Sequence, residues 1–331
     1  MSIEPGQLAR RMFRFAVGLA CALVLGVGPA VAQDYPNKPI RLVLGYPPGG
    51  STDATGRVIG PRLGEILGAQ IVIENKGGAG GTIASEYVAR AAPDGYTLLL
   101  NTSSPLVIAP HTYQKLPHDT LKDLAPITTV GVTPEALCVH PSVPAKNLKE
   151  LVQLAQTQDV TISSSGNGTL PHLSIELFKQ ISKGRFVHVP YKGAGPAVTD
   201  TVAGHVRGVL MDLPAVISFI KDGKLRGIAL TANQRTDFLP DLPSSVEQGF
   251  PTLIAVNWLG IWAPAKTPRA IIDKVFAALV KAESSPEVKE RLARVGVAAS
   301  TMASPDAFQK FIAEEFQKWG KIAKQSGARA D

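Results

Sequence analysis

The sequence predicts an α/β fold of two lobes, each built on a parallel-type sheet and joined by a two-strand hinge, with a ligand cleft between the lobes. Two observations lead to this prediction. From residue 39 onward, apolar runs of strand length alternate with segments whose apolar residues recur at helical spacing, and such alternation is typical of parallel sheets with helical crossovers. The chain of 331 residues is also long enough for two separate cores.

The first lobe is expected to open this alternation. Val58, Ile59 and Leu63 fall on one face of a helix, whereas Ile71-Val72-Ile73 is a short apolar run suited to a buried strand. The strands are predicted over 40–44, 70–74 and 97–100, and the helices over 52–67 and 82–91.

A second alternating series predicts the second lobe. A new apolar strand begins around Glu135 and ends at His140. Further strands are predicted over 160–164, 186–189, 206–211 and 225–232, and helices over 147–156, 172–182, 196–203 and 216–220.

The C-terminal part is expected to return to the first lobe. Residues 252–263 read as extended and aromatic, and helices are predicted over 268–284 and 305–325. Because these helices have no strands of their own, the chain must cross between the lobes near 132–140 and again near 254–264, which would form a hinge. We therefore place lobe I at 33–135 and 256–331 and lobe II at 136–255.

Residues 1–32 have the features of an export signal. They contain three arginines, an apolar stretch shorter than the roughly 20 residues that span a bilayer, and the small-residue site Ala30-Val31-Ala32. Cleavage near Ala32 would deliver the protein to the periplasm. The adjacent Arg10 and Arg11 leave both the Sec and the twin-arginine route open.

Charge and cysteine content exclude several classes of protein. Removal of residues 1–32 takes away three of the 34 basic and one of the 27 acidic residues, leaving 31 and 26 and a net charge of +5. This charge is too diffuse for a nucleic-acid face, so no nucleic acid is expected as a partner. Only Cys138 remains, which excludes an intramolecular disulfide.

Three glycine-containing turns are the candidate binding elements. Each follows an apolar strand and precedes a helix, and such turns gather at the carboxyl ends of strands, where open α/β sheets bind ligands. Free N–H groups and the dipole at a helix start favour an anion such as a carboxylate. The turns are Gly49-Gly50-Ser51-Thr52-Asp53, Ser163-Ser164-Ser165-Gly166-Asn167-Gly168-Thr169 and Tyr191-Lys192-Gly193-Ala194-Gly195-Pro196.

Each candidate also has a plainer interpretation. Ser51, Asp53 and Thr169 can simply cap helices, and a single such turn is better explained in that way. His172 can donate to a carboxylate or only pack at its helix start, and Asp212 can face the cleft or cap the next turn. Three such turns in one exported two-lobed chain favour a ligand cleft.

No pattern for catalysis, metal or cofactor binding is present in the sequence. It lacks a G-x-S-x-G elbow, zinc-ligand spacing among its six histidines, and a complete dinucleotide or P-loop fingerprint. We therefore predict no catalytic residue, no metal and no cofactor. An exported serine hydrolase of small esters or amides, using Ser164 or Ser165 with His172, remains the alternative.

Several motifs together resemble one family. They cover nearly the whole mature chain: Pro47-Pro48-Gly49-Gly50-Ser51-Thr52-Asp53, Gly77-Gly78-Ala79-Gly80-Gly81, Pro93-Asp94-Gly95-Tyr96-Thr97, Gly166-Asn167-Gly168-Thr169 with His172 to Phe178, Val189-Pro190-Tyr191-Lys192-Gly193, Gly223-Lys224-Leu225-Arg226 and Ala263-Pro264-Ala265-Lys266-Thr267-Pro268. In these motifs the chain resembles the extracytoplasmic solute receptors of the tripartite tricarboxylate transporter system, often called Bug receptors.

The resemblance implies a periplasmic-binding-protein type II fold and a function. A receptor of this family closes on a small organic carboxylate and delivers it to integral-membrane permease subunits; we expect a monomer. A receptor that presents its ligand to a sensor kinase is a further alternative. Carried onto this sequence, the ligand-binding residues would be Gly49, Gly50, Ser51, Thr52, Asp53 and Ser103 in lobe I, and Ser164, Ser165, Gly166, Thr169, His172, Tyr191 and Asp212 in lobe II.

Overall fold

Nine strands form one continuous mixed sheet in the computed structural model, which describes residues 35–330. The order of the strands is β2-β1-β3-β9-β4-β7-β5-β6, with β8 paired to β4 as well. Strand β4 (Leu124–Val139) is the longest and takes part in both halves of this sheet, here called sheet A and sheet B. Residues Lys38–Asp331 form one compact unit.

Sheet A contains the strands of the predicted first lobe. Its members are β1 (Ile40–Leu44), β2 (Ile71–Asn75), β3 (Thr97–Thr102), β9 (Val256–Pro264) and the first part of β4. Strand β1 is parallel to β2 and β3, whereas β9 runs antiparallel to both β3 and β4. The sheet is therefore parallel on one side and antiparallel where the chain leaves and returns.

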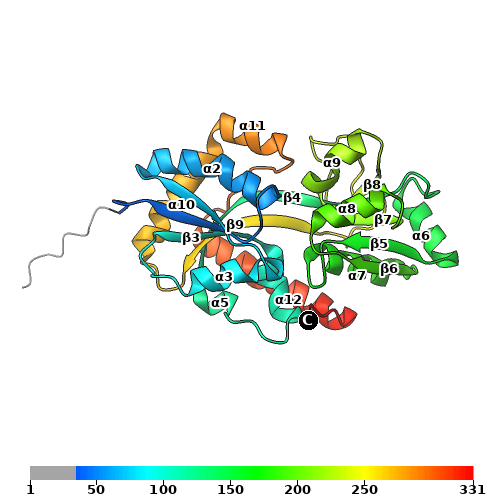
Figure 1. Ribbon diagram of the computed structural model, residues 1–331, viewed down its shortest axis with the longest axis horizontal. Helices are drawn as coiled ribbons and strands as arrows, with labels where there is room; N and C mark the ends of the chain where they lie inside the picture. The colour runs from blue at the N-terminus through cyan, green and yellow to red at the C-terminus, as the bar shows by residue number, and fades with distance from the viewer. Residues whose placement is uncertain (1–34, 331) are drawn as a thin grey trace, which may run out of the picture. The chain divides into compact units, whose positions relative to one another are not determined.

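Sheet B repeats this plan. Its members are β5 (Val160–Ser164), β6 (Phe186–Pro190), β7 (Gly208–Asp212), β8 (Arg226–Leu230) and the second part of β4. Strand β5 is parallel to β6 and β7, and β4 is antiparallel to β7 and β8. Figure 1 shows β4 and β9 extending from one group of strands toward the other.

The two crossings lie side by side. Thr133 pairs with Asn257 and Pro134 with Val256, and the N–H of Glu135 donates to the carbonyl of Ala255 at 3.3 Å. Beyond Glu135, strand β4 changes partners from β9 to β7 and β8. This confirms the predicted pair of connecting segments, because β4 and the segment that leads into β9 connect sheet A and sheet B at the same point.

Helices cover both faces of each sheet (Figure 1). The helices are α2 (Ser51–Leu67), α3 (Thr82–Ala89), α4 (Ala109–Thr112), α5 (Thr120–Asp123), α6 (Leu148–Thr157), α7 (Leu170–Ser182), α8 (Ala194–Val202), α9 (Leu213–Lys221), α10 (Arg269–Ser284), α11 (Pro286–Arg294) and α12 (Pro305–Ser326), with short turns η1 (Ala79–Gly81) and η2 (Ser104–Ile108). Helices α10 and α11 pack on α2, so this part of the C-terminal region lies beside the first helix of the sheet A series.

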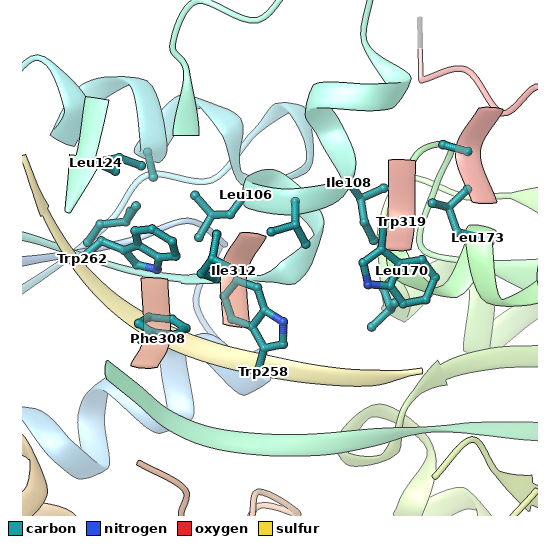
Figure 2. Close-up of a cluster of buried hydrophobic side chains, with 14 of the residues drawn as sticks. Leu106, Ile108, Leu124, Leu170, Leu173, Trp258, Trp262, Phe308, Ile312 and Trp319 are labelled. Atoms are coloured by element: carbon teal, nitrogen blue, oxygen red, sulfur yellow. The ribbon is translucent and has the colours of Figure 1, made fainter. Parts of the chain in front are cut away.

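One apolar core reaches across both halves. Trp258 and Trp262 of β9 pack on Phe308 of α12, and further along α12 Trp319 belongs to the same buried cluster as Leu170 and Leu173 of α7. Figure 2 shows these side chains lying in one row. Two further cores lie on opposite faces of sheet B. Helix α7 is therefore fixed to the C-terminal helix as well as to its own sheet.

Four elements differ from the sequence prediction. Strand β4 begins at Leu124, whereas the predicted strand began only around Glu135. Pro126 and Pro134 interrupt the usual strand pattern before that point. Helix α11 was not predicted, since Pro286 follows the previous helix directly and reads as a break. The short helices α4 and α5 were also not predicted.

Two other predictions concern membrane and export. Within residues 35–330, no helix combines the length and apolar character needed to cross a bilayer. The predicted export signal, residues 1–32, lies outside the described residues. Cys138 is a free, buried thiol, and burial raises its pKa, as expected for an unreactive core residue.

Candidate ligand-binding site

The first turn presents free backbone donors. Gly50 is the N-cap of α2 but supplies no side-chain capping bond, and Gly49 and Gly50 are exposed. Among the described residues, no acceptor occupies the backbone N–H groups of Ser51, Thr52 or Asp53. Three unpaired donors at the positive end of a 17-residue helix are an arrangement that favours an anionic group.

Asp53 holds this turn in shape. Its buried carboxylate accepts from the N–H of Gly49 at 3.0 Å, from Arg57 Nε at 3.0 Å and from Asn75 Nδ2 at 3.1 Å. Burial raises the pKa of Asp53, but the hydrogen bonds from Arg57, Gly49 and Asn75 outweigh burial and lower it overall. The carboxylate is thus saturated within the turn, so it positions the backbone donors.

A chain of hydrogen bonds connects the first turn to the opposite half. Ser51 Oγ donates to Asp212 Oδ2 at 3.4 Å, and Asn257 Nδ2 donates to the same oxygen at 2.9 Å. Ser103 Oγ in turn donates to Asn257 Oδ1 at 3.0 Å. Asp212 is the N-cap of α9 and makes no capping bond with its side chain, so its carboxylate faces the other half instead of closing its own helix. The structure therefore brings Ser51, Ser103 and Asp212 together.

Tyr46 lies beside this network. Its hydroxyl contacts Thr102 Oγ1 at 3.0 Å and donates to the carbonyl of Gly80 at 3.1 Å. Burial raises the pKa of Tyr46 to about 12, with a further contribution from the nearby carboxylate of Asp212. The hydroxyl stays neutral and is a polar group at the same junction.

The second turn uses several of its own donors. The N–H of Gly166 donates to Ser164 Oγ at 3.1 Å, and the N–H of Gly168 donates to His172 Nδ1 at 3.0 Å. The N–H of Leu170 donates to Ser104 Oγ at 3.1 Å, which ties the start of α7 to the start of η2, just after β3. In the first turn of α7, Leu170 is bonded and Pro171 has no N–H, so among the described residues only His172 keeps a free donor there, against three at the start of α2. The loop before α7 also leaves the N–H groups of Ser165, Asn167 and Thr169 without an acceptor in the part of the chain that the structure describes.

The predicted side chains of the second turn are held by neighbours. Ser164 Oγ lies 2.6 Å from His188 Nε2, and the His188 ring stacks on His172 with 3.9 Å between ring centroids. Thr169 Oγ1 donates to the carbonyl of Gly166 at 2.7 Å. Burial lowers the pKa of His172 to about 4, and burial with the neighbouring His172 lowers that of His188 to about 3. Both rings are neutral at pH 7.

The third turn lies next to the second. The N–H of Tyr191 donates to the carbonyl of Ser164 at 3.1 Å, and the N–H of Gly193 donates to the carbonyl of Ser165 at 3.1 Å. The Tyr191 hydroxyl donates to Asp200 Oδ2 at 2.6 Å, and this bond is the main reason that its pKa rises to about 12. Tyr191 therefore supports the second turn, with its hydroxyl committed to α8.

Two site residues escaped the sequence prediction. Asn257 links Ser103 to Asp212, and Glu135 is wholly buried opposite Asp212 in the register of β4 and β7. Glu135 had a detectable signal, since it is the one charged residue in the run 124–139. No comparable signal marks Asn257 in the sequence, except that it is a polar residue in an otherwise apolar strand.

Other places offer less. A surface hollow of about 400 Å³ lies between α5, β4, α10 and α12, and none of the predicted site residues lines it. Within residues 35–330, no three His, Cys, Asp or Glu side chains are grouped so that they could hold a metal ion.

Comparisons with known proteins agree with this architecture. The family model described as "Tripartite tricarboxylate transporter family receptor" matches residues 56–328. The protein BugT of Bordetella pertussis is 34% identical over 316 residues, covering 95% of this chain and 97% of BugT. A structure described as a periplasmic transporter has a TM-score of 0.82 at 37% identity, covering 90% of this chain and all of the other. An R. palustris protein solved with adipate has a TM-score of 0.82 at 30% identity, covering 89% and 99% of the two chains.

Fold and site together define a class of protein. Two α/β halves connected by paired strands, with helix N-termini at the junction, are the type II fold of periplasmic solute-binding receptors. The chain belongs to the tripartite tricarboxylate transporter receptor family.

Proposed function

We propose that this receptor binds a small organic carboxylate in the cleft between two lobes, without chemical conversion, and delivers it to integral-membrane permease subunits. The lobes would be residues 33–135 with 256–331, and residues 136–255. The protein would act in the periplasm as a monomer, after cleavage of an export signal near Ala32. The adipate in the related R. palustris structure supports a carboxylate as the class of ligand.

One observation carries this proposal. The N-terminus of α2 offers three unpaired N–H donors at the point where Ser51 meets Asp212 of the other half. A carboxylate there would gain charge-assisted hydrogen bonds, which are about twice as strong as neutral ones. Because donors of one half and side chains of the other lie on either side, binding would favour closure of the two lobes. The remaining predicted residues, Ser165 among them, are proposed to line the same cleft.

Ligand binding is best tested with the mature protein. Thermal unfolding in the presence of mono-, di- and tricarboxylates should identify a ligand, because binding to the folded state alone raises its apparent stability. Titration calorimetry then gives the affinity. If no carboxylate shifts the unfolding midpoint, the proposal fails.

Gly50→Val tests the position of the carboxylate. A Cβ at Gly50 would meet no atom within 4 Å and the backbone angle is ordinary, so the substitution should leave the unfolding midpoint unchanged. The added side chain would occupy the space in front of the free donors, and we expect at least a tenfold loss of affinity, or about 1.4 kcal/mol. Gly50→Ala should lose less. An unchanged affinity in Gly50→Val would place the carboxylate elsewhere.

The alternative of a serine hydrolase has one observation in its favour. Ser164 Oγ and His188 Nε2 are within hydrogen-bond distance, so the histidine partner differs from the predicted His172. However, Ser164 is fully buried, and its hydroxyl also interacts with the N–H and carbonyl of Gly166. Hydrolysis of p-nitrophenyl esters that disappears in Ser164→Ala would establish the alternative; we expect no turnover in either protein.

A further inference from the structure

Two carboxyl groups face each other at the junction of the two halves. Glu135 and Asp212 are directly paired residues of the antiparallel strands β4 and β7, so their side chains lie on the same face of the sheet. Asp212 is half-buried and linked to Ser51 and Asn257, whereas Glu135 is fully buried behind it. The pair therefore lies where the two halves meet.

No cationic side chain balances this pair. Among the described residues, neither Glu135 nor Asp212 forms an ion pair, and the cations near the first turn are engaged elsewhere, Arg57 with Asp53 and Lys76 with Glu74. The groups that face Asp212 are the neutral donors Ser51 and Asn257 and the hydroxyl of Tyr46. A negative charge at Asp212 would oppose binding of a simple carboxylate next to it.

Glu135 is a buried acid with no cationic neighbour within residues 35–330. Both of its carboxyl oxygens are buried and receive no hydrogen bond from the described residues, which is costly for an ionised group. Burial, together with the neighbouring Asp212, raises the pKa of Glu135 well above its usual range. A protonated Glu135 adds no charge of its own and can donate its proton to the neighbouring carboxyl group of Asp212.

We propose that Asp212, supported by Glu135, forms an acceptor site for the ammonium group of the ligand, so that the preferred ligand is a small amino carboxylate. This inference rests on the proposed function. The carboxylate would bind the free N–H groups of α2, and the ammonium group would bind Asp212. Ser51, the first residue of α2, touches Asp212 directly, so the two subsites are one side chain apart. That separation suits charged groups on the same or neighbouring carbon atoms.

The test uses ligand pairs that differ only by the amino group. Calorimetric titrations at pH 7.5 compare glycine with acetate, aspartate with succinate, glutamate with glutarate, and phenylalanine with 3-phenylpropionate. In the best-binding pair, the amino acid should bind at least about tenfold more tightly, since a charge-assisted hydrogen bond contributes this much. Malate, which carries a neutral hydroxyl donor, should fall between aspartate and succinate if that pair binds.

Two variants assign the preference to Asp212. Asp212→Asn should reduce the preference to less than about threefold, because the amide removes the charge and keeps the size. Asp222→Asn is the matched control, since it removes one exposed acid at the other end of the same helix and should keep the preference. Glu135→Gln, which keeps Asp212, should lower the preference less than Asp212→Asn.

The outcomes separate this inference from the proposed function. If a deaminated acid binds as tightly as its amino partner in the wild-type protein, the ammonium site is wrong while carboxylate binding stands. The wild-type titrations decide this even if Asp212→Asn does not fold. If Asp212→Asn folds and keeps the preference, the site is also wrong. If no member of any pair binds, the proposed function itself fails.

Discussion

The first and second glycine turns share a sequence pattern but differ in their surroundings. Both follow a parallel strand and begin a helix, and both were predicted to bind a ligand. In the first turn, a saturated Asp53 holds the loop and three backbone donors stay free. In the second, the N–H groups of Gly166, Gly168 and Leu170 are bound to Ser164, His172 and Ser104, so the start of α7 is partly closed.

This difference teaches how a strand-to-helix turn becomes a site. The second turn lies against the first half: Gly168 packs on Thr112 and Ala330, and Leu170 enters the apolar core of α12. The second turn therefore joins the two halves by direct contact. The first turn makes no such contact through the N–H groups at the start of α2, which stay free within residues 35–330. Both turns contain glycines, so the glycines do not distinguish them. A turn can bind a ligand only where its N–H groups have no acceptor within the protein.

The largest expected effect comes from valine at two positive-φ glycines, Gly168 in the second turn and Gly49 in the first. At Gly168 (φ 68°), a Cβ would lie 2.7 Å from Thr112 Oγ1 and 2.8 Å from Ala330 Cβ, whereas at Gly49 (φ 94°) it would meet no atom within 4 Å. Gly168→Val should therefore cost about 4 kcal/mol in unfolding free energy, from strain plus overpacking, and Gly49→Val about 2 kcal/mol, from strain alone.

Urea unfolding measures both values. Equal costs at the two positions would contradict the view that the second turn is a packed contact. Gly49→Val should in addition weaken carboxylate binding, because the strained residue shifts the donors of α2.

A smaller effect should appear on acidification. Since the folded-state pKa values of His172 and His188, about 4 and about 3, lie below the usual 6.5, the unfolded chain takes up protons first as the pH falls. Folding stability should therefore fall as the pH drops below 6.5, by roughly 2 kcal/mol at pH 6 for the two rings together. Urea unfolding at pH 7.5 and pH 6 measures the loss, and His188→Gln should reduce it by about half. An identical pH dependence in the variant would show that the rings do not cause it.

The smallest effect concerns Asp53→Asn in the first turn. The amide loses the ion pair with the half-exposed Arg57 but can still accept from the N–H of Gly49, so we expect a cost of about 1 kcal/mol at pH 7. Because the pKa of Asp53 is lowered on folding, its stabilisation is present above the unfolded pKa and is lost as the pH falls below about 3.8. The difference in unfolding free energy between variant and wild type should thus shrink at pH 3. At this pH the stabilisation from neutral His172 and His188 is already lost. A difference that persists at pH 3 would exclude the carboxylate as its source.

Much of the fold could be predicted from local pattern. Strands β1 and β5 and helix α12 were predicted within one residue of their observed bounds, because apolar periodicity and helix caps are local signals. The first part of β4 was not predicted, since its two prolines fit only beside the particular partners that β9 provides. Asn257 and Glu135 could not be assigned to a site, because nothing local connects residues on strands β4 and β9 to Asp212 on β7.

By itself the sequence determined the two α/β series, the paired crossing segments and the glycine turns, since these depend on periodicity and on backbone freedom at named residues. The tertiary structure decided which helix start keeps its donors free, and it brought Ser51, Ser103, Asn257, Glu135 and Asp212 to one junction. The physical reason is that a helix N-terminus offers donors wherever it occurs, but only the packing of distant segments determines whether another part of the chain already accepts them.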